Sequence, residues 1–160
     1  KDVLIEVDPS VGQVPPVLAP PSVVQEALAN LLANAAAFTP AGKTVVVWAR
    51  AQKKGVVEVA VRDQGPGFDP AVLRSLWRAF VTRRPGGTGL GLAATLRSLR
   101  KCGGRLWAAN LPSGGAEVHF TLLTAEGAQG WPGGLAWGLV CAAGAAFILA
   151  GKGFGALLAR

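Results

Sequence analysis

Short runs in which hydrophobic and polar residues alternate recur along the chain, and this period of two is typical of half-buried β-strands. The clearest run is Val56–Arg62, where Val57, Val59 and Val61 alternate with less hydrophobic positions. Other segments rich in β-branched and aromatic residues are expected to be further strands: Val3–Val7, Lys43–Arg50, Arg105–Ala109 and Glu117–Leu122. The pattern therefore predicts strands distributed over most of the chain up to Leu122.

An apolar stripe with helical spacing follows the first of these strands and a proline-rich connection. Its members recur at intervals of three and four residues: Val24, Ala27, Leu28, Leu31, Leu32 and Ala35. Ser22 precedes the stripe and is expected to be the helix N-cap, with Gln25 completing a capping box. Pro40 and Gly42 are expected to end the helix, because neither favours a helical conformation.

Two further helices are expected after the strand Val56–Arg62. A short helix begins at Pro70 after an Asp69 N-cap and runs to about Trp77. A longer helix follows the glycine-rich segment Gly87–Leu92 and ends at Gly103-Gly104. Its apolar face is formed by Leu92, Leu96 and Leu99.

The turn after the strand Val56–Arg62 carries the first candidate chemistry. Asp63-Gln64-Gly65-Pro66-Gly67 places a carboxylate at the strand end, beside two glycines. A carboxylate held there can accept a hydrogen bond from an exocyclic amine such as that of adenine, and glycines let the backbone approach a flat ligand closely. Alone, this motif is weakly specific, because many strand-ending turns resemble it.

Two asparagines lie within the first predicted helix. Asn30 and Asn34 are four residues apart and therefore share one face. Asparagine is a poor helix former, and its amide oxygen is a suitable ligand for a hard cation such as magnesium. Taken alone, these residues leave two interpretations open, a solvent-exposed polar face and a metal-binding face.

The segment Gly87-Thr88-Gly89-Leu90-Gly91-Leu92 leads directly into a predicted helix. Backbone N–H groups at a glycine-rich helix N-terminus can hold phosphate groups. The segment is not a P-loop, because no Gly-Lys-Ser/Thr ends it, and it is not a dinucleotide fingerprint, because no strand precedes it. An ordinary loop before a helix is the alternative interpretation.

Composition narrows the function classes. The formal net charge is +7 and the pI is about 10.3, but lysines and arginines are scattered, without the aromatic-interleaved basic stripe that single-strand nucleic-acid binders use. We therefore expect no nucleic-acid partner. The two cysteines, Cys102 and Cys141, lie far apart and the single histidine is His119, a composition that argues against a zinc site. His119 is expected to be an outward-facing strand residue without a catalytic role.

Taken together, the segments resemble the ATP-binding catalytic domain of sensor histidine kinases, within the superfamily shared with type II topoisomerases, MutL mismatch-repair proteins and heat-shock chaperones. Each motif alone is weak to moderate, but their order and spacing match. The matching segments are Asn30–Ala35 with Phe38–Pro40 (the N box), Asp63–Gly67 (the first glycine box), Leu76–Phe80 with Thr82 (the F box) and Gly87–Leu92 (the second glycine box). The resemblance implies an α/β two-layer sandwich with a mixed, largely antiparallel sheet and helices on one face.

The resemblance also implies roles for single residues. Asn34 would coordinate the Mg2+ that bridges the nucleotide phosphates, and Asn30 would support the metal or the phosphates. Asp63 would accept a hydrogen bond from the adenine amine of ATP, and Gly67 and Phe38 would shape the base pocket. Arg84 is a third candidate catalytic residue, in a lid over the phosphates, where relatives often carry lysine. Further nucleotide contacts are expected from Gly65, Phe80, Thr82, Gly87, Thr88, Gly89, Leu90 and Gly91.

Departures from the family pattern indicate what the chemistry would be. Hydrolysing branches of the superfamily carry a glutamate where Asn30 stands, so phosphoryl transfer is favoured over hydrolysis. The sequence contains no histidine-bearing dimerisation helix. The expected partners are therefore a histidine-bearing dimerisation domain outside this sequence and a response regulator, in a full-length homodimer. An adaptor that binds nucleotide without phosphotransfer and an anti-sigma-type serine kinase remain alternatives.

The segment after the predicted domain has a different character. We expect a catalytic domain over residues 1–124 and a hydrophobic tail over residues 125–160. No charged residue lies between Glu126 and Lys152, which is long enough for a helix that crosses or contacts a membrane. A helix packed on the domain or on a partner is the alternative. With a membrane tail, the chain would lie at the cytoplasmic face of a bacterial membrane as a piece of a longer protein.

Overall fold

The computed structural model of this chain describes residues 2–75 and 91–129. The strands in these residues form one sheet of five, in the order β1-β2-β3-β5-β4. Their bounds are β1 Leu4–Val7, β2 Thr44–Gln52, β3 Val56–Arg62, β4 Leu106–Asn110 and β5 Ala116–Leu123. β1 pairs with β2 in parallel, and all other neighbours are antiparallel. The predicted mixed, largely antiparallel sheet is confirmed.

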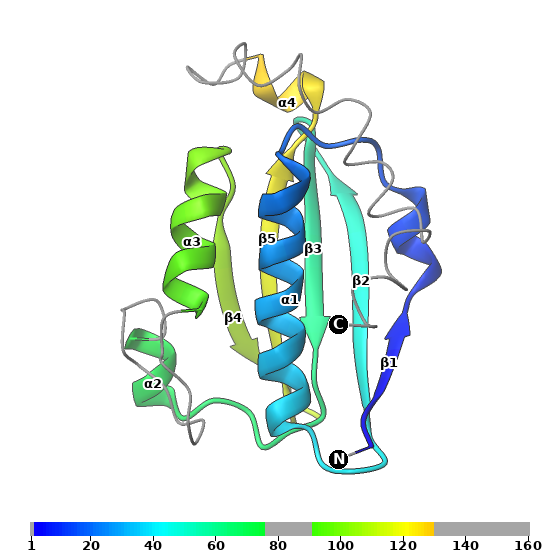
Figure 1. Ribbon diagram of the computed structural model, residues 1–160, viewed down its shortest axis with the longest axis vertical. Helices are drawn as coiled ribbons and strands as arrows, with labels where there is room; N and C mark the ends of the chain where they lie inside the picture. The colour runs from blue at the N-terminus through cyan, green and yellow to red at the C-terminus, as the bar shows by residue number, and fades with distance from the viewer. Residues whose placement is uncertain (1, 76–90, 130–160) are drawn as a thin grey trace.

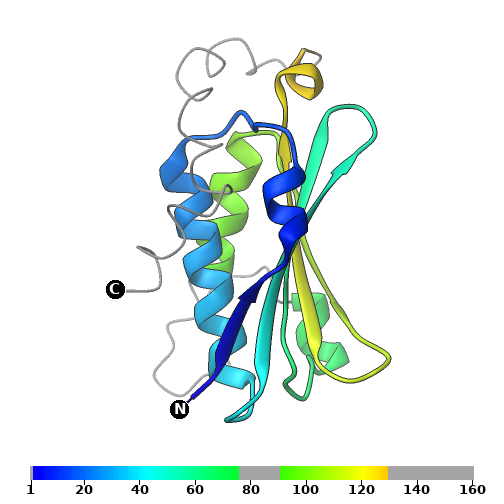
Figure 2. The same cartoon turned by 90° about the vertical axis from the view of Figure 1, so that its right-hand side faces the viewer.

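The two long helices, α1 and α3, lie against one face of this sheet. The bounds of the helices are α1 Pro21–Phe38, α2 Pro70–Ser75, α3 Gly91–Lys101 and α4 Ala125–Ala128, with a 3-10 turn at Pro9–Gln13. Figures 1 and 2 show α1 and α3 side by side on the same side of the sheet, which gives the predicted two-layer α/β sandwich.

The hydrophobic core lies between α1, α3 and the sheet. The apolar stripe of α1 is buried along its whole length, as its spacing predicts. The buried residues that fill this layer include Val24, Leu28, Leu31, Val45, Val47, Val59, Val61, Leu99, Phe120 and Leu122. The core therefore fixes α1 against the central strands, which sets where each end of α1 lies.

The start of α1 differs from the expectation. The helix begins at Pro21, one residue before the predicted N-cap Ser22, and no side chain caps it. A proline at the first helical position lacks the N–H that a cap would satisfy, and its φ already suits a helix. The N–H of Val23 donates to the carbonyl of Pro20 at 2.9 Å, so the backbone supplies the first turn.

Strand β3 is more buried than its alternation predicts. Glu58 and Ala60, expected on a half-exposed face, are 1% and 0% exposed. The reason lies in the register: Ala60 is the direct neighbour of Trp48 on β2 and of His119 on β5. Glu58 lies on the same face of β3, where its carboxylate is bonded to Arg50, Gln52 and His119. The face of the sheet away from α1 therefore carries a buried polar cluster.

Several chain ends meet at one end of the sandwich. Figure 1 shows the ends of α1 and β3 and the β4–β5 connection in the lower half of the molecule, and the start of α3 beside the middle of α1. The asparagine motif lies on α1, the aspartate motif follows β3, and the glycine-rich segment leads into α3. The fold thus gathers motifs that are far apart in the chain.

Some expectations fall on other parts of the chain. In residues 2–75 and 91–129 no helix is long and apolar enough to cross a membrane. The hydrophobic tail expected to form a helix lies almost wholly in residues 130–160, outside the described residues, and so does the predicted end of the second helix at about Trp77. Within the described part, α4 packs on the β2–β3 turn, where the N–H of Thr124 donates to the carbonyl of Gly55 at 2.8 Å.

Candidate functional site

Asp63 is the central side chain at the lower end of the sheet. It is 8% exposed, and its Oδ1 accepts hydrogen bonds from the N–H of Gly65 at 2.8 Å and the N–H of Ala116 at 3.2 Å. Both bonds reach the same oxygen, and no described residue donates to Oδ2. The carboxylate is thus fixed in orientation while one of its oxygens remains able to accept an outside donor.

Burial has a direct effect on this carboxyl group. It raises the pKa of Asp63 above its ordinary value, although the two backbone N–H groups oppose the rise. A carboxylate that has lost part of its hydration gains more from a new hydrogen-bond donor than an exposed one does. Asp63 therefore has the chemistry of a ligand-binding acceptor.

The two glycines after Asp63 shape the turn in different ways. A Cβ on Gly65 would lie 2.8 Å from the carbonyl oxygen of Phe38, at the end of α1, so glycine is needed for this close approach. Gly67 has φ +78°, a conformation that side-chain-bearing residues rarely adopt. The side chain of Phe38 is 40% exposed beside this turn. The predicted residues Phe38, Asp63, Gly65 and Gly67 are therefore brought together.

The two asparagines of α1 have different surroundings. The Nδ2 of Asn30 donates to Thr95 Oγ1 at 2.9 Å and to the carbonyl oxygen of Gly91 at 3.4 Å, which joins α1 to the first turn of α3. The side chain of Asn34 is half-buried, and no hydrogen bond joins it to another described residue. Of the two, Asn30 joins two helices through its Nδ2, whereas Asn34 has no hydrogen-bond partner among the described residues.

The glycine-rich segment is only partly described. Gly91 is the first residue of α3 and lies beside Asn30. The remaining candidates of the second glycine box and the lid lie outside the described residues: Phe80, Thr82, Arg84, Gly87, Thr88, Gly89 and Leu90. Their assignments stay predictions.

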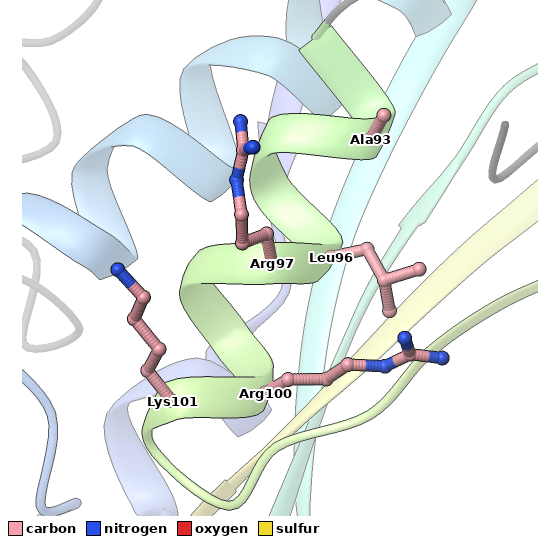
Figure 3. A pocket seen from close by; sticks show the side chains of 5 residues that line it. All are labelled: Ala93, Leu96, Arg97, Arg100 and Lys101. Atoms are coloured by element: carbon pink, nitrogen blue, oxygen red, sulfur yellow. The ribbon is translucent and has the colours of Figure 1, made fainter. Parts of the chain in front are cut away.

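A hollow of about 520 Å3 lies along α3, away from this site. Figure 3 shows its lining side chains, Ala93, Leu96, Arg97, Arg100 and Lys101. Arg100 and Lys101 occupy the last turn of α3, where positive charge is favourable to the helix dipole. Among the described candidate site residues, none lines this hollow.

His119 lies on the opposite face of the sheet, in a cluster with Glu58, Glu117, Trp48 and Trp107. Its Nδ1 is 2.9 Å from Glu58 Oε1 and its Nε2 is 3.3 Å from Glu117 Oε2. The ring stacks on Trp107 with centroids 5.0 Å apart, and its side chain is 11% exposed. Both ring nitrogens thus face carboxylates, and the residue expected to face outward is buried within this cluster.

The comparisons with known proteins identify the family. A model described as histidine kinase-, DNA gyrase B-, and HSP90-like ATPase matches residues 20–126. The chain belongs to this ATPase family. The matched part contains the ATP-binding catalytic domain found in sensor histidine kinases, as the resemblance implies.

Curated relatives agree. The sensor protein FixL of Bradyrhizobium diazoefficiens is 36% identical over 105 residues, covering 64% of this chain and 21% of FixL. The adaptive-response sensory kinase SasA of Synechocystis is 30% identical over 112 residues, covering 68% of this chain and 29% of SasA. The chain thus spans less than a third of the length of either relative.

Solved structures agree as well. The mycobacterial sensor histidine kinase MprB aligns with a TM-score of 0.64 at 29% identity, covering 76% of this chain and 80% of that structure. Full-length ShkA in complex with AMPPNP aligns with a TM-score of 0.65 at 32% identity, covering 78% of this chain and 26% of that one. The fold of the catalytic domain is therefore shared.

Two residues of the candidate site were missed by the sequence analysis. Asn110, at the end of β4, bonds to the backbone of Phe68 through both atoms of its amide. Gly115, with φ +87°, lies against Asp63: a Cβ there would be 2.2 Å from the Asp63 carbonyl oxygen. The Pro112–Gly115 run signals only a turn between strands, so nothing local in the sequence points to the aspartate it contacts.

Proposed function

We propose that this chain binds Mg-ATP at the lower end of its sheet and donates the γ-phosphoryl group to a histidine outside this sequence. The observation that carries the proposal is the hydrogen bonding of the Asp63 carboxylate. One carboxylate oxygen is held by two backbone N–H groups, and the other has no donor among the described residues. An exocyclic amine is a donor that this oxygen can accept, so adenine is the proposed base.

Asn34 is the proposed protein ligand of Mg2+. Its half-buried side chain makes no hydrogen bond to a described residue, and an amide oxygen is a ligand type that Mg2+ accepts. No group of three or more His, Cys, Asp or Glu side chains in the described part of the chain could hold a metal. Oxygens of the nucleotide phosphates would complete the coordination. When bound, Mg2+ neutralises charge on the phosphates and thereby favours phosphoryl transfer.

The first turn of α3 is the proposed phosphate-binding end of the site. Gly91 begins the helix, and the backbone N–H groups of a helix start favour negative groups. Arg84, Thr82 and the other glycines of the second glycine box are proposed to complete it. The amide of Asn30 cannot accept a proton as a glutamate would, which supports transfer to a protein side chain over hydrolysis by an activated water.

The acceptor is proposed to lie on another domain. His119 is the only histidine of the sequence, and both its ring nitrogens face carboxylate oxygens in a packed cluster. We therefore propose a histidine-bearing dimerisation domain as the direct partner and a response regulator as the next one. In the full-length protein the arrangement would be a homodimer at the cytoplasmic face of a bacterial membrane.

Two measurements test this function. The first is titration of a fluorescent ATP analogue with and without Mg2+, in which we expect saturable binding that tightens with Mg2+. The second adds a histidine-bearing dimerisation domain of a sensor kinase and labelled ATP, and we expect acid-labile label on that domain but none on this chain. Absence of any nucleotide binding would overturn the proposal, whereas binding without transfer to any such domain would favour the adaptor alternative.

A further inference from the structure

The β4–β5 connection contacts the candidate base pocket although it carries none of the four motifs. Asn110 is the last residue of β4, and its Oδ1 accepts the N–H of Phe68 at 2.7 Å. Its Nδ2 donates to the carbonyl oxygen of the same residue, also at 2.7 Å. One side chain thus makes both hydrogen bonds that a neighbouring backbone would make in a sheet.

These two bonds fix the exit of the turn that begins at Asp63. The entrance is fixed by β5, because Asp63 N–H donates to the Ala116 carbonyl at 2.8 Å and Ala116 N–H donates to Asp63 Oδ1. Asn110 provides the second anchor, beyond Gly67. The turn is therefore held at both ends by the same hairpin.

Gly67 lies directly against the Asn110 side chain. A Cβ at Gly67 would lie 3.0 Å from Asn110 Oδ1 and 3.3 Å from the carbonyl oxygen of Gly115. The left-handed conformation of Gly67 and the position of the asparagine amide are consequently adjusted to each other. A change at residue 110 would alter the path of the backbone that follows Asp63.

We propose that Asn110 is a positioning residue for nucleotide binding, which holds the turn after Asp63 in the shape that admits the base. This inference rests on the proposed function, since it assigns the base end of the same pocket. Asn110 acts on the ligand through Phe68 and Gly67. It should affect the base portion of the nucleotide and leave the phosphate portion unaffected.

The location of the bonds separates this role from a purely structural one. Asn110 is exposed, so solvent replaces its hydrogen bonds readily when they are removed, and the free energy of unfolding should change little. A role in positioning instead predicts weaker binding of ligands that contain adenine, at nearly constant stability.

The experiment compares Asn110→Ala, Asn110→Asp and the matched control Ser113→Ala in the full chain. Ser113 is an exposed residue of the same hairpin. Each protein is titrated with a fluorescent ATP analogue, which is then displaced by ATP and by inorganic tripolyphosphate with Mg2+. Thermal unfolding checks the fold of each variant.

For Asn110→Ala we expect the dissociation constant of ATP to rise about five- to tenfold and that of tripolyphosphate to stay within about twofold. Asn110→Asp keeps the acceptor and loses the donor, so an intermediate loss is expected. Ser113→Ala should match the wild type. Equal ATP affinity in Asn110→Ala and wild type, or an equal loss for both ligands, would overturn the inference alone. A wild-type chain that binds no nucleotide would overturn the proposed function as well.

Discussion

Strand β3 has a buried carboxylate near each end, and their surroundings differ. Near its start, the side chain of Glu58 is 2% exposed and accepts hydrogen bonds from Arg50 at 2.7 Å and from Gln52, and its other oxygen is 2.9 Å from His119 Nδ1. Burial opposes ionisation, but these partners outweigh it, so the pKa of Glu58 lies below its ordinary value. Both carboxylate oxygens of Glu58 thus have partners inside the fold.

Asp63, just after the end of β3, is the opposite case. It has two backbone donors on one oxygen and none on the other among the described residues, and burial raises its pKa. The comparison teaches that burial alone does not mark a functional carboxylate. Glu58 has partners on both oxygens and is expected to stabilise the fold, whereas Asp63 keeps one oxygen without a described partner and is the proposed ligand acceptor. This difference can be tested on both stability and nucleotide binding.

The largest effect is expected at Glu58. Glu58→Ala removes the shared acceptor of Arg50 and Gln52 and the partner of His119, and it leaves a cavity at a buried position. We expect a loss of about 2–4 kcal/mol in the free energy of unfolding, measured by urea denaturation. The nucleotide affinity of the folded protein should stay unchanged, because the site lies at the other end of β3.

A matched control is the partner arginine. Arg50→Ala removes a side chain that is 62% exposed, so its ion pair with Glu58 is largely screened by solvent. We expect a loss of about 1 kcal/mol or less from this variant. Equal losses from Glu58→Ala and Arg50→Ala would show that the cluster does not depend on the buried glutamate.

Asp63→Asn should have the opposite effect to Glu58→Ala, with weaker nucleotide binding and no loss of stability. Asparagine keeps an oxygen for the N–H groups of Gly65 and Ala116, but places an amide donor where the free acceptor was. We expect ATP affinity to fall roughly tenfold to a hundredfold, because the adenine amine loses its acceptor. Unfolding temperature should be unchanged or higher. Titration with a fluorescent ATP analogue measures the affinity, and unchanged binding would remove Asp63 from the base pocket.

The sequence indicated Asp63 as a candidate site residue but did not indicate that Glu58 is buried, and the difference has a physical reason. Asp63 belongs to a local motif that can be recognised within five residues, and so do the strands and the apolar stripe of α1. The partners of Glu58 are Arg50 and Gln52 on β2 and His119 on β5, and no single segment of the sequence determines the register that pairs these strands.

The same reason explains why Asn110 was missed. Its partner Phe68 is 42 residues away in the chain, and a lone asparagine at a strand end has no distinctive local signal. The helix start at Pro21 was misplaced for a different reason, since Ser22 and Gln25 form a local capping pattern that the preceding prolines make unnecessary.

The pH dependence of stability should separate the two carboxylates by sign. The pKa of Glu58 is lowered on folding, so its contribution is present above its unfolded pKa and is lost as pH falls through the folded pKa. The pKa of Asp63 is raised, so its contribution is present below its unfolded pKa and is lost as pH rises through the folded pKa.

Urea denaturation between about pH 3 and about pH 7 measures both effects. The advantage of wild type over Glu58→Gln should grow with rising pH. The advantage of Asp63→Asn over wild type should also grow with rising pH, since asparagine carries no buried charge. Curves for wild type and Asp63→Asn that stay parallel across this range would contradict the raised pKa of Asp63.

The smallest effect is expected within α1, where the same contrast recurs between two amides. The Nδ2 of Asn30 donates to Thr95 Oγ1 and to the Gly91 carbonyl, and Thr95 is buried, so Asn30→Ala leaves a buried hydroxyl with a poorer partner. We expect a loss of about 1 kcal/mol in the free energy of unfolding. The side chain of Asn34 has no such bonds, so Asn34→Ala should be neutral or slightly stabilising through better helix propensity.

Mg2+-dependent tightening of ATP binding should disappear in Asn34→Ala and persist in Asn30→Ala. If Asn30→Ala alone abolished this dependence at unchanged stability, the metal ligand would be Asn30, and the contrast between bonded and unbonded amides would not distinguish structural from binding residues in this site.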